Sequence, residues 1–146
     1  MTPYDDLRKV FEINYYAAID LSQRVARAML KRKKGVILNI SSIQAGRGQP
    51  GNLAYGGSKA ALNHMTRVMG NELGQYGIRV NAIAPTIIES PMLKKMDIAA
   101  RDRLIEESAL STILKPEQVA DLVSFLVSER ASQINGQVIN LDGGIL

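Results

Sequence analysis

The chain of 146 residues contains no cysteine and only one histidine, His64. Without cysteine it has neither a disulfide framework nor a thiolate nucleophile. A lone histidine with no carboxylate near it in the sequence assembles neither a metal site nor a Ser-His triad, so we expect no metal. No apolar run reaches the roughly 18 residues of a membrane span, and residues 1–6 lack the character of a secretory or transit peptide. We therefore expect a cytoplasmic protein with no membrane partner.

Charge of one sign is not in large excess, since 18 basic residues face 14 acidic ones and leave a net charge of +4. This balance does not indicate a polyanion, and we expect no nucleic-acid partner. The cluster Lys31-Arg32-Lys33-Lys34 is either a solvated helix end or a docking point for an acidic partner such as an acyl carrier protein. Helix-end preference favours the first interpretation by about four to one.

Periodicity predicts strands that alternate with helices. Thr2 and Pro3 are typical of an N-cap and a first helical residue, and the apolar stripe that follows is interrupted only by Asn14. Short β-branched runs between the helices are typical of strands buried on both faces of a parallel sheet. Right-handed crossovers then give an α/β fold, a doubly wound parallel sheet covered by helices. The expected helices cover residues 3–34, 55–73, 92–96, 99–109 and 115–128, and the expected strands cover 36–40, 78–84 and 137–141.

Tyr55 and Lys59 lie four residues apart at the start of a predicted helix and therefore share one face of it. An ammonium group beside a phenol favours the phenolate, which makes such a tyrosine usable as a general acid or base. The Tyr–Lys spacing is weak evidence of a catalytic pair by itself, because five Tyr and eight Lys in 146 residues give about 0.3 such spacings by chance. Ser42 strengthens it, because this residue follows a predicted strand at the sheet edge where ligands bind.

Five segments in a fixed order carry a stronger signal than any one of them. They are Asn14; Asn39-Ile40-Ser41-Ser42; Tyr55-Gly56-Gly57-Ser58-Lys59; Arg79-Val80-Asn81-Ala82-Ile83-Ala84-Pro85; and Gly136-Gln137-Val138-Ile139-Asn140-Leu141-Asp142-Gly143-Gly144. The set resembles the catalytic half of a short-chain dehydrogenase/reductase, nearest in appearance to the 3-oxoacyl-(acyl-carrier-protein) reductase branch. The resemblance covers essentially the whole chain. It implies a Rossmann-type sheet that is N-terminally truncated, with residues 1–146 as a single partial domain.

The resemblance implies a role for each catalytic position. Tyr55 matches the family's general acid/base, which exchanges a proton with the substrate carbonyl or hydroxyl. Lys59 matches the lysine that favours the phenolate and binds the nicotinamide ribose, and Ser42 matches the serine that holds the substrate oxygen. Ser41 is then a structural hydroxyl at the strand end. Asn14 matches the residue that kinks the long helix and holds a proton-relaying water, which explains a polar side chain on an apolar stripe.

The segment that begins at Pro85 resembles the family's contact with the nicotinamide ring and carboxamide. Ile88 matches the backbone-contacting position, and Ser90 replaces the usual threonine. Thr86 stands where the family has glycine and adds a Cβ at a point of close approach. The cofactor is NAD or NADP, and the choice stays open because the chain has no Gly-rich pyrophosphate turn. The expected cofactor-binding residues are Tyr55, Lys59, Pro85, Ile88 and Ser90.

Residues 86–115 form an apolar, irregular segment where the family has its substrate lid. Its side chains are equally well explained as cover for the sheet or as walls for an apolar or acyl substrate. The family's other half, on the order of 100 residues, is missing. We therefore expect the isolated chain to be inactive and the first strand to have an unpaired edge.

Three hypotheses about function stay open. The one we favour is an NAD(P)-dependent oxidoreductase half that interconverts a secondary alcohol and a ketone once an N-terminal half completes it. The second is a catalytically inactive truncated paralogue that acts as an interaction or regulatory subunit through its two long helices. The third is a binding module for a small ligand. The expected partners are an alcohol or ketone substrate, acyl compounds included, and either further copies in a dimer or tetramer or the missing half.

Overall fold

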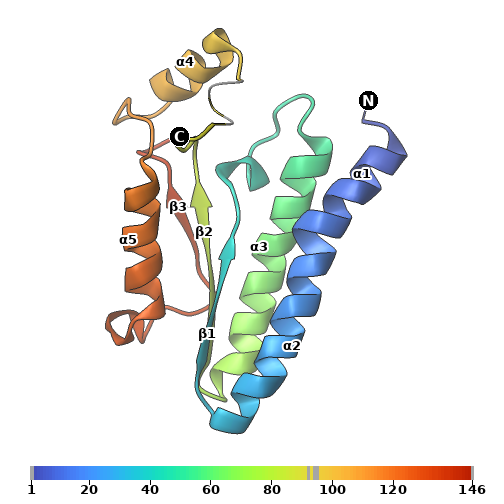
Figure 1. Ribbon diagram of the computed structural model, residues 1–146, viewed down its shortest axis with the longest axis vertical. Coiled ribbons are helices and arrows are strands. Elements are labelled where there is room, and N and C mark those ends of the chain that lie inside the picture. The colour runs from blue at the N-terminus through green and yellow to red at the C-terminus, as the bar shows by residue number, and fades with distance from the viewer. Residues whose placement is uncertain (1, 92, 94–95, 146) are drawn as a thin grey trace.

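The centre of the molecule is a three-stranded parallel sheet in the order β1-β2-β3. The computed structural model describes residues 2–91, 93 and 96–145. The strands are β1 (Gly35–Ile40), β2 (Ile78–Pro85) and β3 (Val138–Leu141) (Figure 1). The central strand β2 pairs with both neighbours, placing Gly35 opposite Ile78 and Ala82 opposite Val138. Its apolar run is buried almost throughout, as a strand covered on both faces requires. The predicted strands and their parallel pairing are confirmed.

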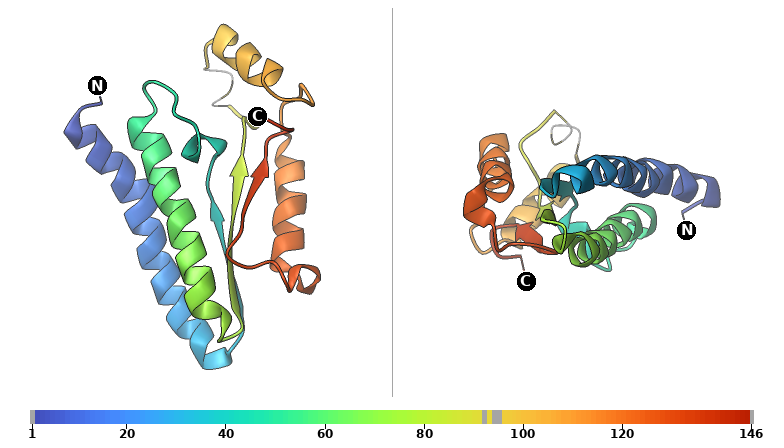
Figure 2. Two further views of the ribbon diagram at one scale, coloured as in Figure 1. Left: turned by 180° about the vertical axis from the view of Figure 1, so that it is seen from behind. Right: turned by 90° about the horizontal axis from the view of Figure 1, so that it is seen from below.

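Helices cover both faces of this sheet, which confirms the predicted Rossmann-type α/β arrangement. α2 (Ala17–Arg32) and α3 (Leu53–Gly74) lie on one face and α5 (Pro116–Val127) lies on the other (Figures 1 and 2). Two clusters of buried side chains follow from this layering, a larger one with members on α2 and α3 and a smaller one that includes α5. The larger contains Ala26, Ile37, Leu62, Met65, Met69, Ile78 and Val80, and the smaller contains Ile83, Leu126 and Ala131.

The first long helix consists of α1 (Tyr4–Phe11), a π-helical segment η1 (Glu12–Tyr16) and then α2. The prediction of Thr2 as its N-cap is wrong. Pro3 takes that position with a ψ of 144°, and its carbonyl accepts the first helical hydrogen bond, at 3.1 Å from the Leu7 amide. Asn14 lies within η1, so the polar interruption of the apolar stripe coincides with a local change of helical pitch.

α4 (Ile98–Glu106) lies at the C-terminal end of the strands and does not cover a face of the sheet (Figure 1). It ends earlier than predicted, because Ser108 instead forms an isolated bridge with Ile145. The helical stretch predicted at 92–96 lies partly outside the described residues. Short 3-10 turns, η2 (Ile43–Ala45) and η4 (Glu129–Ala131), follow β1 and α5. In the part of the chain that the structure describes, no helix is long and apolar enough to cross a bilayer.

Candidate active site

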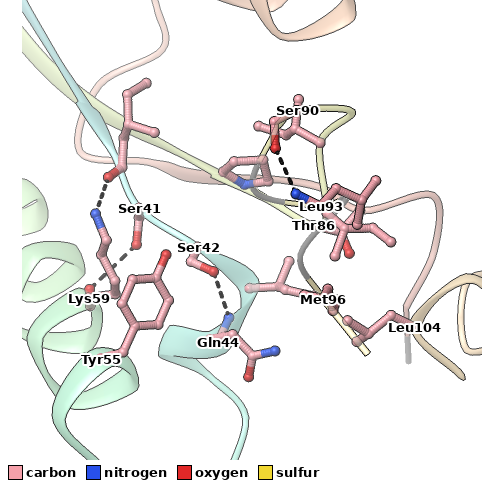
Figure 3. Close-up of a pocket in the computed structure, with 15 residues that line it drawn as sticks. Ser41, Ser42, Gln44, Tyr55, Lys59, Thr86, Ser90, Leu93, Met96 and Leu104 are labelled. Carbon is pink, nitrogen blue, oxygen red and sulfur yellow. Dashed lines mark hydrogen bonds between the residues drawn. The ribbon is translucent and has the colours of Figure 1, made fainter. Parts of the chain in front are cut away.

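A cavity of about 420 Å³ lies at the C-terminal end of β1 and β2 (Figure 3). This is the edge at which open parallel sheets bind ligands. Its walls come from the turn after β1, the start of α3, the end of β2 and the segment 86–115. Polar groups therefore converge here from parts of the chain that are distant in sequence. They are Ser41, Ser42, Gln44, Tyr55, Lys59, Thr86 and Ser90.

Tyr55 and Lys59 both lie in the first turns of α3 and line this cavity, as their spacing predicts. The Lys59 Nζ donates a hydrogen bond to the Ile40 carbonyl at 2.8 Å and lies 5.8 Å from the centroid of the Tyr55 ring. Tyr55 is 41% exposed, and Figure 3 shows its hydroxyl directed toward the serines at the end of β1. Burial lowers the pKa of Lys59 below its ordinary value. The lysine is thus held beside the phenol with donors left for a ligand.

Ser42 and Ser41 have different environments at the end of β1. The Ser42 Oγ accepts a hydrogen bond from the Gln44 amide at 3.2 Å, and in the part of the chain that the structure describes its own proton has no acceptor. The Ser41 Oγ donates to the Lys59 carbonyl at 3.4 Å and so links the strand end to α3. This contact supports the structural role expected for Ser41, although that residue also reaches the cavity wall.

Asn14 does not line the cavity. Its Nδ2 donates to the Ser58 Oγ at 3.1 Å, and that hydroxyl donates in turn to the Tyr55 carbonyl at 2.7 Å. Among the described residues, no hydrogen bond joins Asn14 directly to Lys59. The structure therefore attaches η1 to the turn of α3 that carries the tyrosine, through a fully buried serine. The water relay stays a prediction.

The end of β2 and the residues after it form the opposite wall, where Pro85, Ile88 and Ser90 line the cavity. Their contact with a cofactor stays a prediction. Thr86 also lines the cavity, and its Oγ1 is buried without a hydrogen-bond partner in the described structure. The Ser90 Oγ accepts from the Leu93 amide at 3.3 Å, and among the described residues its proton has no acceptor. A carboxamide carries both a donor and acceptors, so these unused groups fit a nicotinamide.

Two contributors to this region were not foreseen from the sequence. Gln44 lines the cavity, and its Oε1 accepts a hydrogen bond from the Asn52 Nδ2 at 2.9 Å. Arg47, in the same loop, forms an ion pair with Glu107 at 2.6 Å, which joins the loop to the end of α4. Sequence periodicity predicts neither the Gln44–Asn52 contact nor the Arg47–Glu107 ion pair, because both involve side chains in loops.

His64 lies away from the cavity, in a groove between α2 and α3. Within the described residues, no group of three or more His, Cys, Asp or Glu side chains is placed to hold a metal ion. The phenol, ammonium and hydroxyl groups that line the cavity can transfer protons and donate hydrogen bonds.

The sheet, its two helical layers and the polar cavity at the strand ends define a doubly wound α/β protein of Rossmann type. A family model described as "Enoyl-(Acyl carrier protein) reductase" matches residues 1–146. The chain belongs to the short-chain dehydrogenase/reductase family, as its motifs predict.

Curated relatives and solved structures agree with this assignment. The 3-oxoacyl-(acyl-carrier-protein) reductase FabG of Thermotoga maritima is 38% identical over 142 residues, which cover 97% of this chain and 58% of that protein. A 3alpha-hydroxysteroid dehydrogenase of Mediterraneibacter gnavus is 36% identical over 139 residues, covering 95% and 56%.

Two of the solved structures contain nicotinamide cofactors. A 7 alpha-hydroxysteroid dehydrogenase complexed with NADH and 7-oxo glycochenodeoxycholic acid matches with a TM-score of 0.94 and 34% identity, covering 99% of this chain and 57% of that one. A gluconate 5-dehydrogenase from Burkholderia cenocepacia in complex with NADP and tartrate has a TM-score of 0.94 and 28% identity, with the same coverage. The chain thus spans less than two thirds of the length of these relatives.

Proposed function

We propose that this chain is the catalytic half of an NAD(P)-dependent oxidoreductase that interconverts a secondary alcohol and a ketone. The observation that carries the proposal is the convergence of Ser42, Tyr55 and Lys59 on one cavity at the sheet edge. A phenol, an ammonium group and a hydroxyl group within one cavity are suited to proton exchange with a carbonyl oxygen. Family membership and the cofactors in related structures support this choice.

In the reductive direction, Ser42 donates a hydrogen bond to the substrate carbonyl oxygen and Tyr55 gives that oxygen its proton. The hydride for the carbonyl carbon would come from a nicotinamide held at this site. The substrate oxygen becomes a hydroxyl and Tyr55 becomes a phenolate, with the Lys59 Nζ 5.8 Å from the centroid of its ring. A proton from solvent then restores the phenol. Asn14, whose Nδ2 donates to the Ser58 Oγ, would hold the water that relays this proton to Lys59. In the oxidative direction, the phenolate accepts the alcohol proton.

The cofactor's nicotinamide end would be held by Tyr55, Lys59, Pro85, Ile88 and Ser90. NAD and NADP both remain candidates, because related structures contain one or the other. We propose that an N-terminal cofactor-binding half, on the same chain or on another, completes the pocket, which agrees with the 57% share of those structures that this chain covers. The isolated chain would then be inactive. An enzyme of this kind would work in the cytoplasm, which the absence of cysteine favours.

Residues 86–115 would act as the substrate lid. Leu93, Met96 and Leu104 from this segment line the cavity and give it an apolar wall. Such a wall favours a substrate with an apolar or acyl part. A lid that closes over the cavity would also exclude water from the reacting carbonyl.

The complete enzyme would form a homo-oligomer through α2 and α3. A groove of about 590 Å³ lies between these helices, and Leu21 and Val68 on them are exposed. The same face would serve the alternative function, a catalytically inactive interaction subunit. The two functions differ in chemistry, since only the first requires the cavity.

The test is a comparison between the chain alone and the chain joined to a cofactor-binding half. Reduction of ketones should be measured by loss of NADH or NADPH absorbance, together with cofactor affinity by calorimetry. We expect turnover from the joined protein and none from the isolated chain. Robust reduction by the isolated chain would contradict the half-enzyme proposal, and a joined protein that binds cofactor without turnover would favour the interaction subunit.

A further inference from the structure

The Ser58 hydroxyl lies outside the cavity, one residue before Lys59 in the sequence, and the proposed chemistry assigns no role to it. Ser58 is fully buried. Its Oγ donates a hydrogen bond to the Tyr55 carbonyl at 2.7 Å and accepts one from the Asn14 Nδ2 at 3.1 Å. One hydroxyl on α3 therefore joins the turn that carries the tyrosine to the π-helical segment η1.

The directions of these two hydrogen bonds determine the orientation of the Asn14 amide. A backbone carbonyl can only accept, so the single proton of the Ser58 hydroxyl points to Tyr55. The Ser58 Oγ can then only accept from Asn14, and only the Nδ2 end of that amide can donate. An inverted amide would place two acceptors, the Asn14 Oδ1 and the Ser58 Oγ, against each other. Ser58 thus keeps the Asn14 Oδ1 directed away from itself.

The Asn14 Oδ1 is consequently an acceptor with a fixed orientation. Within the described structure it has no hydrogen-bond partner, and Asn14 is only partly buried, so water can reach it. A water that donates one proton to this oxygen keeps its other proton and its lone pairs for further hydrogen bonds. An amide that could invert would also present Nδ2 to the same water and would reverse the water's orientation.

We propose that Ser58 is a positioning residue, which holds the Asn14 amide with Oδ1 directed outward and so orients the water that relays protons to Lys59. This inference rests on the proposed function for the proton relay. Ser58 contacts neither substrate nor cofactor in this account and acts only through Asn14.

The same helix contains a matched control for Ser58. The Thr66 Oγ1 donates to the Leu62 carbonyl at 2.8 Å and accepts from the Asn39 Nδ2 at 2.9 Å, and Thr66 is also fully buried. Neither Thr66 nor Asn39 lines the cavity. Thr66→Val therefore removes a buried hydroxyl with the same bonding pattern, as Ser58→Ala does, but leaves the proposed relay intact.

Nuclear magnetic resonance on the chain itself tests the amide contact without turnover. The side-chain amide signals of Asn14 are assigned by their loss in Asn14→Leu, and one of the two protons should be protected from exchange with solvent. Ser58→Ala should shift the signal of this proton and raise its exchange rate by about tenfold, whereas Thr66→Val should change neither. An Asn14 signal that Ser58→Ala leaves unchanged would overturn the proposal.

Reduction kinetics of the joined protein test the consequence for proton transfer. Ser58→Ala should lower kcat by about tenfold and change KM by less than about twofold. It should also raise the solvent deuterium isotope effect on kcat, because proton supply then limits turnover. Thr66→Val should leave all three values unchanged.

A double variant separates a positioning role from a structural one. If Ser58 acts only through Asn14, adding Ser58→Ala to Asn14→Leu should lower kcat no further. Independent losses from the two substitutions, or a lower kcat in Ser58→Ala with an unchanged isotope effect, would give Ser58 a structural role and refute the proposal.

The two proposals fail in different ways. A joined wild-type protein without turnover, in which the Asn14 signal still depends on Ser58, would refute the redox function and support the contact. A joined protein that turns over ketones with the same kcat in Ser58→Ala as in the wild type would refute the positioning role and support the redox function.

Discussion

The ion pair between Arg47 and Glu107 gives the most quantitative prediction about stability. The Arg47 Nη2 lies 2.6 Å from the Glu107 Oε2, and the two side chains are only 22% and 32% exposed. The pair joins residues 60 positions apart, in the loop after β1 and directly after α4, next to the candidate substrate cavity. We expect Glu107→Gln to destabilise the fold and to loosen α4 in particular.

The magnitude follows from the burial of this pair. Exposed ion pairs contribute about 0.2–1 kcal/mol, and hydrogen bonds to charged groups about 1.5–3 kcal/mol. A pair of intermediate exposure should lie between these limits, so we expect Glu107→Gln to lower the free energy of unfolding by about 1–2 kcal/mol. The Arg47 Nη1 is buried without a partner in the described structure, so Arg47→Met removes an unsatisfied group along with the pair. It should therefore cost less than Glu107→Gln.

The assay is urea unfolding of each variant, with hydrogen exchange of the α4 amides as a local readout. The matched control is Asp20→Asn, which breaks an ion pair of 2.8 Å whose side chains are 61% and 72% exposed, and should cost less than about 0.5 kcal/mol. Faster exchange in α4 is expected for Glu107→Gln and not for Asp20→Asn. A cost for Glu107→Gln no greater than that of the control would refute the reasoning.

Three further substitutions test buried polar groups. Burial lowers the pKa of Lys59, so the unfolded chain holds its proton to higher pH, and stability should rise as the pH increases through the folded pKa toward the ordinary 10.5. The free energy of unfolding should therefore rise relative to that of Lys59→Met over this interval, and a constant difference would contradict the shift. Asn81→Ala should cost about 2–4 kcal/mol in urea unfolding, because fully buried Asn81 bonds the Ile134 carbonyl at 2.8 Å and the Gln137 amide at 2.9 Å. A cost below about 0.5 kcal/mol would mean that water replaces both bonds. Thr86→Val should raise the thermal midpoint, since it removes a buried hydroxyl without a partner. A lower midpoint would show that this hydroxyl is bonded in solution.

The regular elements were predictable because their signals are local. β2 was recognised because its apolar run needs no knowledge of its neighbours. The four-residue spacing of Tyr55 and Lys59 placed them on one face of α3, and the end of a parallel strand placed Ser42 near them. Family motifs predict a cofactor contact at Pro85, and the structure shows that Pro85 lines the same cavity. The cofactor contact itself stays a prediction.

The remaining features depend on side chains that meet across loops. Gln44 and Asn52 are eight residues apart in a glycine-rich loop, where no periodicity predicts which groups face each other. The predicted N-cap, Thr2, is one residue before the observed N-cap, Pro3. Both residues precede the helix, and only the backbone geometry distinguishes them. The contact of Asn14 with Ser58 joins different helices and follows only from their packing.

The most direct test of the central claim is the rate of hydride transfer in Tyr55→Phe, measured by stopped-flow loss of NAD(P)H signal in the joined protein. Tyr76→Phe is the matched control, because Tyr76 is similarly exposed, at 44% against 41%, and lies outside the cavity lining. If Tyr55 is the general acid/base, its loss should slow transfer by about 10²–10⁴-fold while Tyr76→Phe changes nothing. Retention of more than a few per cent of the wild-type rate in Tyr55→Phe, with cofactor still bound, would contradict the account.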